Sequence, residues 1–226
     1  MLNLQLYTFY QSGSAYRVRI ALNLKDLAYE PIFIKGGRNS PELRSEEFRR
    51  LNPQGALPAL IHNGRAYTQS AAIIEYLDEV YPETSLLPVS PAHRQRVRAL
   101  AQVVTSDIHP LTTARILDYI DSTLQLRHDQ QQEWQRHWIS TGLSAMEEML
   151  ATDPNTGEYC HGDRPSLADV CLIPQLYTAR RFGVDLSGLP TILHIEAQCR
   201  RHQAFQWAAP ENQPDAPQGT PVSHDR

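Results

Sequence analysis

The stretch from Asn52 to Ser70 constrains the fold most, because a proline stands directly before an apolar run. Pro58 precedes residues 59–61, Ala-Leu-Ile, which have the composition of a short strand. A proline in a sheet is confined to an edge or to the first residue of a strand. Cis prolines mark tight turns, and a cis Leu57–Pro58 bond would leave the N–H and C=O of Leu57 outside the sheet. We therefore expect the Leu57 backbone to be open to a bound peptide, which would pair with it like an added strand.

The rest of this stretch predicts a hairpin followed by a helix. Asn63-Gly64 is a favoured two-residue turn, residues 65–68 return as a second strand, and a helix runs from Gln69-Ser70 to about Tyr81. We predict Ser70 as the N-cap of this helix, where neighbouring N–H groups can hold a carboxylate. The competing interpretation is that Pro58 only begins a strand and Ser70 only caps a helix. Their combination in one segment favours a binding site.

Composition excludes several classes of function. The chain has 226 residues, 41% of them hydrophobic and 20% charged, and its formal net charge of -4 gives no reason to expect nucleic acid as a partner. We find no signal-peptide pattern and no apolar stretch near the roughly 20 residues that span a membrane, and therefore expect a cytoplasmic protein. The 3 cysteines are far apart and read as reduced thiols, and the 9 histidines lack metal-ligand spacing.

Periodicity predicts an α/β layer in the first 81 residues. We expect strands at 4–9 and 29–34, a helix at 14–25 between them, and a short helix at 41–50 before the Pro58 stretch. A crossover of this length makes the first two strands parallel, with a right-handed connection. Arg17 and Arg19 are expected on faces of the first helix away from the core, at least one of them as a structural ion-pair partner.

The chain changes character after a proline-rich linker at 82–91. Helices are predicted at 93–122, with a kink or break at Pro110, at 130–150 and at 191–207, and a disordered tail at 208–226. Ser166 and Asp169 have the spacing of a capping box that opens another helix. We expect Asp169 to be structural and not catalytic, because a capping carboxylate is already occupied by backbone donors.

One string near the N-terminus carries the most specific signal. Residues 12–25 read Ser-Gly-Ser-Ala-Tyr-Arg-Val-Arg-Ile-Ala-Leu-Asn-Leu-Lys, and matching elements follow at Leu57-Pro58, Gln69-Ser70 and the Asp-Ile-His-Pro string that begins at Asp107. From Leu4 to Trp207 the sequence resembles the zeta class of the glutathione transferases, which contains maleylacetoacetate and maleylpyruvate isomerases. Most members of that class read Ser-Ser-Cys-Ser where this chain has Ser-Gly-Ser-Ala. A Ser-Gly-Ser start looks more like the bacterial maleylpyruvate branch, in which arginine often precedes the serine; here that residue is Gln11.

The resemblance implies a thioredoxin-like glutathione-binding domain at 1–81, the linker at 82–91, and an all-helical substrate-side domain at 92–207. It implies a homodimer with glutathione as cofactor and a small dicarboxylic keto acid as substrate. The glutathione thiolate would add to the cis double bond of a maleyl keto acid, the bond would rotate, and elimination would return the trans isomer. The candidate residues are, for catalysis, Ser12, Ser14 and Arg181, and, for glutathione, Ser12, Gln54, Leu57, Pro58, Gln69, Ser70, His109 and Arg115.

The candidates have competing interpretations, and a lone histidine such as His109 is often structural. Ser12 and Ser14 are placed to stabilise a thiolate at a helix N-terminus, yet either hydroxyl also serves as a cap. Arg181 and Arg115 are suited to hold carboxylates, but they are equally read as helix-surface charge. Two other functions stay open: a glutathione transferase acting on α-halo acids or general electrophiles, and a non-catalytic glutathione-binding module. The sequence does not distinguish maleylacetoacetate from maleylpyruvate.

Overall fold

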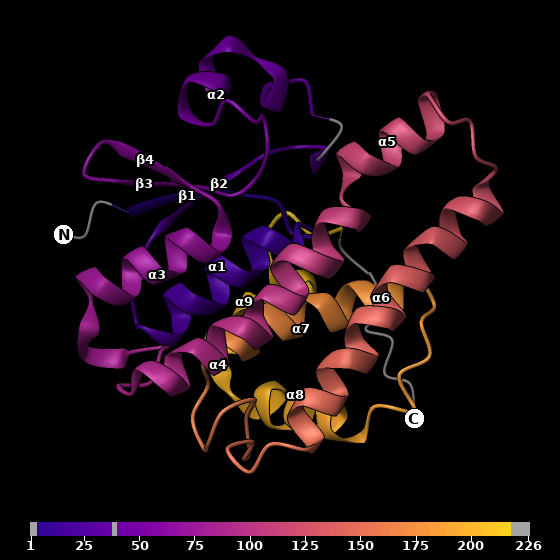
Figure 1. The fold of residues 1–226 in the computed structure, drawn as a ribbon. Coiled ribbons are helices and arrows are strands. Elements are labelled where there is room, and N and C mark those ends of the chain that lie inside the picture. Colours follow the sequence, from indigo (N-terminus) through magenta and orange to yellow (C-terminus); the bar gives the residue numbers. More distant parts are fainter. Residues whose placement is uncertain (1–3, 38–39, 218–226) are drawn as a thin grey trace. The chain divides into compact units, whose positions relative to one another are not determined.

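The structure is a computed structural model that describes residues 4–37 and 40–217 (Figure 1). Contacts divide the chain into two compact units. The first holds the chain up to Thr84 together with the part from Arg201 onward, and the second is Ser85–Arg200. The division falls inside the predicted linker at 82–91, but the chain returns to the first unit after Arg200, so that this unit contains both ends of the described chain.

A four-stranded sheet forms the centre of the first unit. Its strands are β1 (Leu4–Thr8), β2 (Glu30–Phe33), β3 (Ala59–His62) and β4 (Arg65–Thr68), in the order β2-β1-β3-β4. β1 and β2 are parallel, as predicted for a strand-helix-strand crossover, whereas β3 is antiparallel to both of its neighbours. Asn63 and Gly64 both have positive φ, as the predicted hairpin turn requires.

Helices cover both faces of this sheet. Figure 1 shows α1 (Gly13–Leu24) and α3 (Ser70–Val80) on one side and α2 (Glu46–Leu51) on the other. The short helices η2 (Glu42–Arg44) and η3 (Pro82–Thr84) complete the connections. The β-α-β-α-β-β-α order predicted for this part of the chain is confirmed.

The expected outward position of Arg17 and Arg19 on α1 is wrong. Both side chains are buried, Arg17 with 2% and Arg19 with 0% of its surface exposed. Arg19 is buried because the chain returns to this unit and α9 (Gln203–Ala208) packs along α1, where Arg19 Nε donates to the carbonyl of Ala208. Arg17 instead lies at α3, where its Nη1 donates to the hydroxyl of Ser70. The guanidinium groups lie inside and bond to neighbouring oxygens.

The last part of the described chain differs from the predicted helix at 191–207 and tail from 208. Two helices, α8 (Pro190–Arg201) and α9, take the place of one, and the chain breaks at His202, whose Nδ1 accepts a hydrogen bond from the N–H of Ala204 at 3.2 Å. Beyond α9 the chain continues as η6 (Pro210–Asn212) and is described to Pro217; residues 218–226 lie outside the described part.

The regular secondary structure in the described part of the second unit is helical, and loops join the helices; one isolated bridge pairs Thr156 with Gly162. The remaining elements follow in chain order: α4 (Pro91–Gln102), a π-helix η4 (Val103–Ile108), a 3-10 helix η5 (His109–Thr112), α5 (Ala114–Ser122), α6 (His128–Ala151) and α7 (Leu167–Arg181). α7 is buried over most of its length and packs against α4, α6 and η4. The sequence of elements confirms the predicted fold class, an α/β layer followed by helices.

The Ser166–Asp169 capping box opens α7, as the spacing of the two residues predicted. The Asp169 carboxylate accepts bonds from the Ser166 N–H at 2.8 Å and from the Cys160 N–H at 2.8 Å, and the Ser166 hydroxyl donates to it at 2.7 Å. Burial raises the pKa of this carboxyl, and the hydrogen bonds from Cys160 and Ser166 oppose the rise. The contacts are those of a structural residue, as predicted.

None of the helices in the described chain combines the length and apolar character needed to cross a membrane.

Candidate functional site

The register of the sheet brings three chain segments to one edge. Ala59 of β3 is paired with Tyr7 on one side and with Thr68 on the other. The segment that follows β1, the segment that precedes β3 and the segment that follows β4 therefore leave the sheet at the same end. These segments carry Ser12, Leu57-Pro58 and Gln69-Ser70, so the structure gathers the candidates of the first unit.

Ser12 is the N-cap of α1. Its backbone is extended, with φ -69 and ψ 107, and its Oγ accepts a hydrogen bond from the N–H of Ala15 at 3.3 Å. Ser14 lies within the first turn, and both serines are half-buried. A hydroxyl at this position contributes a cap and still has a proton to donate to an anion beside the N-terminus of the helix. Capping and thiolate stabilisation are thus compatible roles for Ser12.

The Leu57–Pro58 bond is cis, and β3 begins only at Ala59. Leu57 therefore precedes the paired residues, with its side chain packed against the core of Ile34, Leu43, Phe48 and Ala59. The Leu57 side chain is thus held by the core, whereas its backbone N–H and C=O lie outside the paired part of the sheet. The sequence prediction of a cis turn with an unladdered Leu57 is confirmed.

A network around Asn52 shapes the turn that leads to Leu57. The buried Asn52 side chain donates to the carbonyl of Ala56 at 2.7 Å and accepts from the N–H of Gln54 at 3.1 Å. Gly55 has φ +60, and a Cβ there would lie 2.8 Å from the carbonyl oxygen of Leu43. Only glycine fits this point, so the turn is held in one shape and presents the exposed side chain of Gln54.

Gln69, and not Ser70, is the N-cap of α3, which corrects the predicted boundary. Gln69 has φ 68 and makes no side-chain capping bond; its Nε2 donates instead to Oε1 of Gln54 at 2.8 Å. Non-glycine residues with such φ values are uncommon and gather at ligand sites. The first turn of α3 thus has no cap from a side chain within the described chain. Its N–H groups remain available to a carboxylate.

Ser70 is the first residue of α3 and is buried, with 6% of its surface exposed. Its Oγ accepts a hydrogen bond from Nη1 of Arg17 at 3.3 Å. A guanidinium remains charged at any relevant pH, so a fixed cation lies beneath the N-terminus of this helix. It adds to the field of the helix dipole, and both favour an anion at Gln69 and Ser70.

The other three candidates, His109, Arg115 and Arg181, belong to the second unit and lie on different elements. His109 is half-buried where the π-helix η4 meets η5. π-helical segments are rare and frequent at functional sites. The π-helix lies close to α6, because a Cβ at Gly142 would overlap the side chain of Ile108. Close packing of the π-helix against α6 therefore fixes the position of the backbone at His109.

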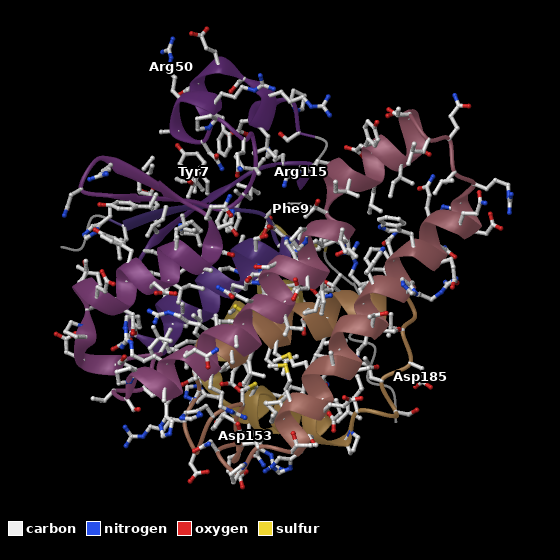
Figure 2. The ribbon with its side chains drawn as sticks, viewed as in Figure 1. Tyr7, Phe9, Arg50, Arg115, Asp153 and Asp185 are labelled. Carbon is white, nitrogen blue, oxygen red and sulfur yellow. The ribbon has the colours of Figure 1, made fainter. Side chains whose placement is uncertain are left out.

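The two arginines that end α7 have different surroundings. Arg180 forms a bidentate pair with Glu196, with both N···O distances 2.6 Å. Arg181 is exposed, and its guanidinium lies over the ring of Phe182 with 5.8 Å to the ring centroid. Arg115 extends from α5 and is also exposed (Figure 2). Of the two arginines of α7, Arg181 is therefore the better placed to bind a ligand carboxylate.

The thiols of this chain are poor nucleophiles. Cys160, Cys171 and Cys199 are free and buried. Burial raises the pKa of Cys160 and of Cys199, and the charge of Asp169 raises both further. A thiolate, which is the reactive form, is disfavoured at both positions. Thiol chemistry in this protein therefore needs a sulfur from a bound molecule.

Sequence reasoning did not find the strained backbone of Gln69, the Gln54–Gln69 hydrogen bond or the π-helix before His109. Positive φ at a glutamine has no sequence signal, since the residue type does not favour it. The clearest available signal for the π-helix was Pro110, which predicted an interruption but not its kind.

Two family models match the chain. The model for the N-terminal domain of glutathione S-transferase matches residues 6–85, and the model for the C-terminal domain matches residues 129–201. The chain belongs to the glutathione S-transferase family. The segments gathered at the sheet edge all lie in the N-terminal domain of this family.

Individual members of the family confirm the resemblance to the zeta class. A probable maleylacetoacetate isomerase of Vibrio cholerae is 48% identical over 216 residues, which cover 96% of this chain and 100% of that protein. The holo structure of a maleylpyruvate isomerase, described as a bacterial zeta-class glutathione S-transferase, is 46% identical with a TM-score of 0.90, covering 94% of this chain and 100% of the other. A maleylacetoacetate isomerase of Methylobacterium extorquens with bound malonate and glutathione is 39% identical with a TM-score of 0.88, covering 94% and 99%.

Proposed function

We propose that this protein is a glutathione-dependent cis–trans isomerase that converts a maleyl keto acid, maleylacetoacetate or maleylpyruvate, into its fumaryl isomer in aromatic catabolism. The observation that carries the proposal is the convergence of an uncapped helix N-terminus, an unladdered backbone and a serine N-cap at one edge of the sheet. Relatives that carry the names of these isomerases support the choice of reaction.

The first unit fits an extended tripeptide that ends in a carboxylate and carries a thiol. The N-terminus of α3 would hold a carboxylate of glutathione, with the N–H of Ser70 and the amide of Gln69 as donors and Arg17 as a cation beneath. Gln54 is bonded to Gln69 and would line the same seat. The N–H and C=O of Leu57 would pair with the peptide backbone, as an added strand does.

Bound glutathione supplies the thiol that adds reversibly to the cis double bond and is released unchanged. The Ser12 hydroxyl would donate a hydrogen bond to the thiolate form, and the N-terminus of α1 would favour its negative charge. Ser14 would assist from the same turn. A hydrogen bond to the charged form lowers the pKa of a thiol, and so raises the fraction of nucleophile at neutral pH.

Arg181 is proposed to bind a carboxylate of the substrate and Arg115 a carboxylate of glutathione, because a guanidinium offers two parallel donors to a carboxylate. His109 is proposed to contact glutathione. His109 and Arg181 follow from the resemblance, Arg115 is chosen for its guanidinium, and the exposed guanidinium of Arg181 supports its part of the assignment.

The decisive experiment measures glutathione stoichiometry with both maleyl compounds. We expect many turnovers per glutathione with one of them, followed as loss of absorbance when the hydrolase for the trans product is added. S-methylglutathione, which keeps the carboxylates but has no free thiol, should compete with glutathione and support no turnover. Consumption of one glutathione per turnover would instead identify a transferase of electrophiles, and absence of glutathione binding would exclude both activities.

We further propose a homodimer in the cytoplasm. The dimer follows from the resemblance, and the free state of all three cysteines is in keeping with a reducing compartment. Light scattering during size-exclusion chromatography would measure the mass in solution; a single-chain mass of 25.7 kDa would exclude the dimer.

A further inference from the structure

Both backbone groups of Tyr10, two residues before Ser12, form hydrogen bonds with side chains. The N–H of Tyr10 donates to Oδ2 of Asp215 at 2.9 Å, and the carbonyl of Tyr10 accepts from Nη2 of Arg19 at 3.1 Å. The N–H of Ser12 donates to the carbonyl of Phe9 at 2.9 Å. The position of Ser12 is therefore tied to the Phe9–Tyr10 backbone, which itself depends on Arg19 and Asp215.

Arg19 joins this backbone to the end of the chain. Its buried guanidinium donates through Nη1 to the hydroxyl of Thr8 at 2.9 Å and to the carbonyl of Phe9 at 3.3 Å, and through Nε to the carbonyl of Ala208 at 3.1 Å. Phe9 lies at the end of β1 (Figure 2). One side chain of α1 thus bridges the loop before Ser12 and the last residue of α9.

The C-terminal segment, defined here as residues 203–215, reaches Asp215 by a fixed course. Close to Asp215, the Gln213 side chain donates to the carbonyls of Trp207 and Ala209 at 2.8 and 3.0 Å and holds the turn. The bond from Asn23 of α1 to the carbonyl of Ala204, at 3.0 Å, is a separate contact at the start of the segment. The other carboxylate oxygen of Asp215, Oδ1, is buried and has no hydrogen-bond partner in the described chain. The carboxylate is therefore directed into the protein at Tyr10 and not into solvent.

We propose that Asp215 is a positioning residue for Ser12: with Arg19 it clamps the Phe9–Tyr10 backbone, so that the C-terminal segment fixes where the Ser12 hydroxyl stands. The inference rests on the proposed function, in which that hydroxyl stabilises the glutathione thiolate. Asp215 itself touches neither the thiol nor the substrate in this account. It acts through a single hydrogen bond to the backbone.

Loss of the clamp has a definite consequence for catalysis. Without the carboxylate, Tyr10 keeps only its carbonyl bond to Arg19, and the loop gains freedom on the side that leads to Ser12. A misplacement of about 1 Å in a reacting group can lower a rate about 100-fold. We expect Asp215→Ala to lower kcat by about 10-fold, to raise the thiol pKa of bound glutathione, and to change the KM for the maleyl substrate little.

The test uses three variants of the full-length chain. Asp215→Ala removes the acceptor, Asp215→Asn keeps an oxygen that can accept the Tyr10 N–H, and Asn23→Ala removes a bond that holds the same segment to α1 without touching the loop. Three quantities are measured on each: kcat, the thiol pKa of bound glutathione from thiolate ultraviolet absorbance, and hydrogen–deuterium exchange of the Tyr10 amide.

In Asp215→Ala the Tyr10 amide should exchange faster, kcat should fall and the thiol pKa of bound glutathione should rise. Asp215→Asn should keep most of the wild-type behaviour. Asn23→Ala should lower the stability of the protein and leave the three quantities unchanged. The inference is overturned if Asp215→Ala leaves the three quantities unchanged, if Asn23→Ala reproduces its effects, or if Asp215→Asn is as damaging as alanine, since charge would then be the cause. A wild-type protein that binds no glutathione would defeat the proposed function instead. Exchange at Tyr10 needs no ligand and tests the clamp in that case too.

Discussion

The N-termini of three helices differ in what satisfies their N–H groups. In the second unit, the carboxylate of Asp169, a residue of α7 itself, accepts the N–H of Ser166 at the start of α7. The carboxylate of Glu147 in α6 accepts the N–H groups of Thr191 and Ile192 at the start of α8, both at 2.9 Å. In the first unit, α3 begins at Ser70, above the guanidinium of Arg17, and its N-cap Gln69 makes no side-chain capping bond.

The difference shows how one local geometry serves either structure or binding. A helix N-terminus attracts a carboxylate in each case. Where the protein supplies that carboxylate, the N–H groups are occupied and the residue stabilises the fold. Where it supplies none but adds a cation, the N–H groups remain ready for a carboxylate from outside. The start of α1, capped by the Ser12 hydroxyl, lies between these extremes.

The largest effect is expected at the start of α7, where Asp169 accepts buried N–H groups. Asp169→Ala leaves the N–H groups of Ser166 and Cys160 buried without an acceptor, and we expect a loss of at least about 3 kcal/mol of unfolding free energy. Urea denaturation followed by circular dichroism measures it. Activity per folded molecule should remain near the wild-type value; a catalytic loss at unchanged stability would show that the start of α7 is also a site.

An intermediate effect is expected at α1. Ser12→Ala should lower kcat about 100-fold, because a donor to the thiolate is lost, and should raise the glutathione requirement by a smaller factor. It should also cost about 1 kcal/mol of stability through the lost cap. Ser14→Ala is the matched control from the same turn and should cost less on both counts. Wild-type kcat and glutathione requirement in Ser12→Ala would refute the role assigned to Ser12.

The smallest expected effect concerns the open end of α3. Ser70→Ala removes the hydroxyl that receives the Arg17 hydrogen bond, and we expect glutathione to bind about 10-fold more weakly by calorimetry, the loss typical of one hydrogen bond to a charged group. Glu147→Gln alters another helix N-terminus and should leave this affinity unchanged. Equal weakening in both variants would mean that the contrast between the helix ends has no bearing on binding.

Local patterns predicted most of the elements. The Asn63-Gly64 turn, the cis Leu57–Pro58 bond and the Ser166–Asp169 box each depend on a few neighbouring residues, so the sequence contains the whole cause. Ser70 was misplaced as the cap of α3 because its usual preference for that position was overridden by Gln69, whose φ of 68 is imposed by its surroundings.

Contacts between residues far apart in the chain could not be predicted from local sequence patterns. Nothing near Arg19 indicates that α9, some 190 residues later, covers it, and nothing near Arg180 indicates that Glu196 occupies its guanidinium. Arg181 was selected from the pair by resemblance, since two adjacent arginines are equivalent by local pattern. A side chain can bind a ligand only if the folded protein does not already pair it with another residue, and that pairing depends on tertiary contacts.

Placement of α9 in the first unit, together with β1 and α1, has a consequence for biosynthesis. β1 and α1 emerge from the ribosome well before α9 and Asp215, which complete their surroundings from later in the sequence. The sheet edge that bears Ser12 can reach its final form only after the chain as far as Asp215 has left the exit tunnel. A nascent chain arrested before α9 would leave the guanidinium of Arg19 uncovered, and quality-control proteases would act on it as an incompletely folded product.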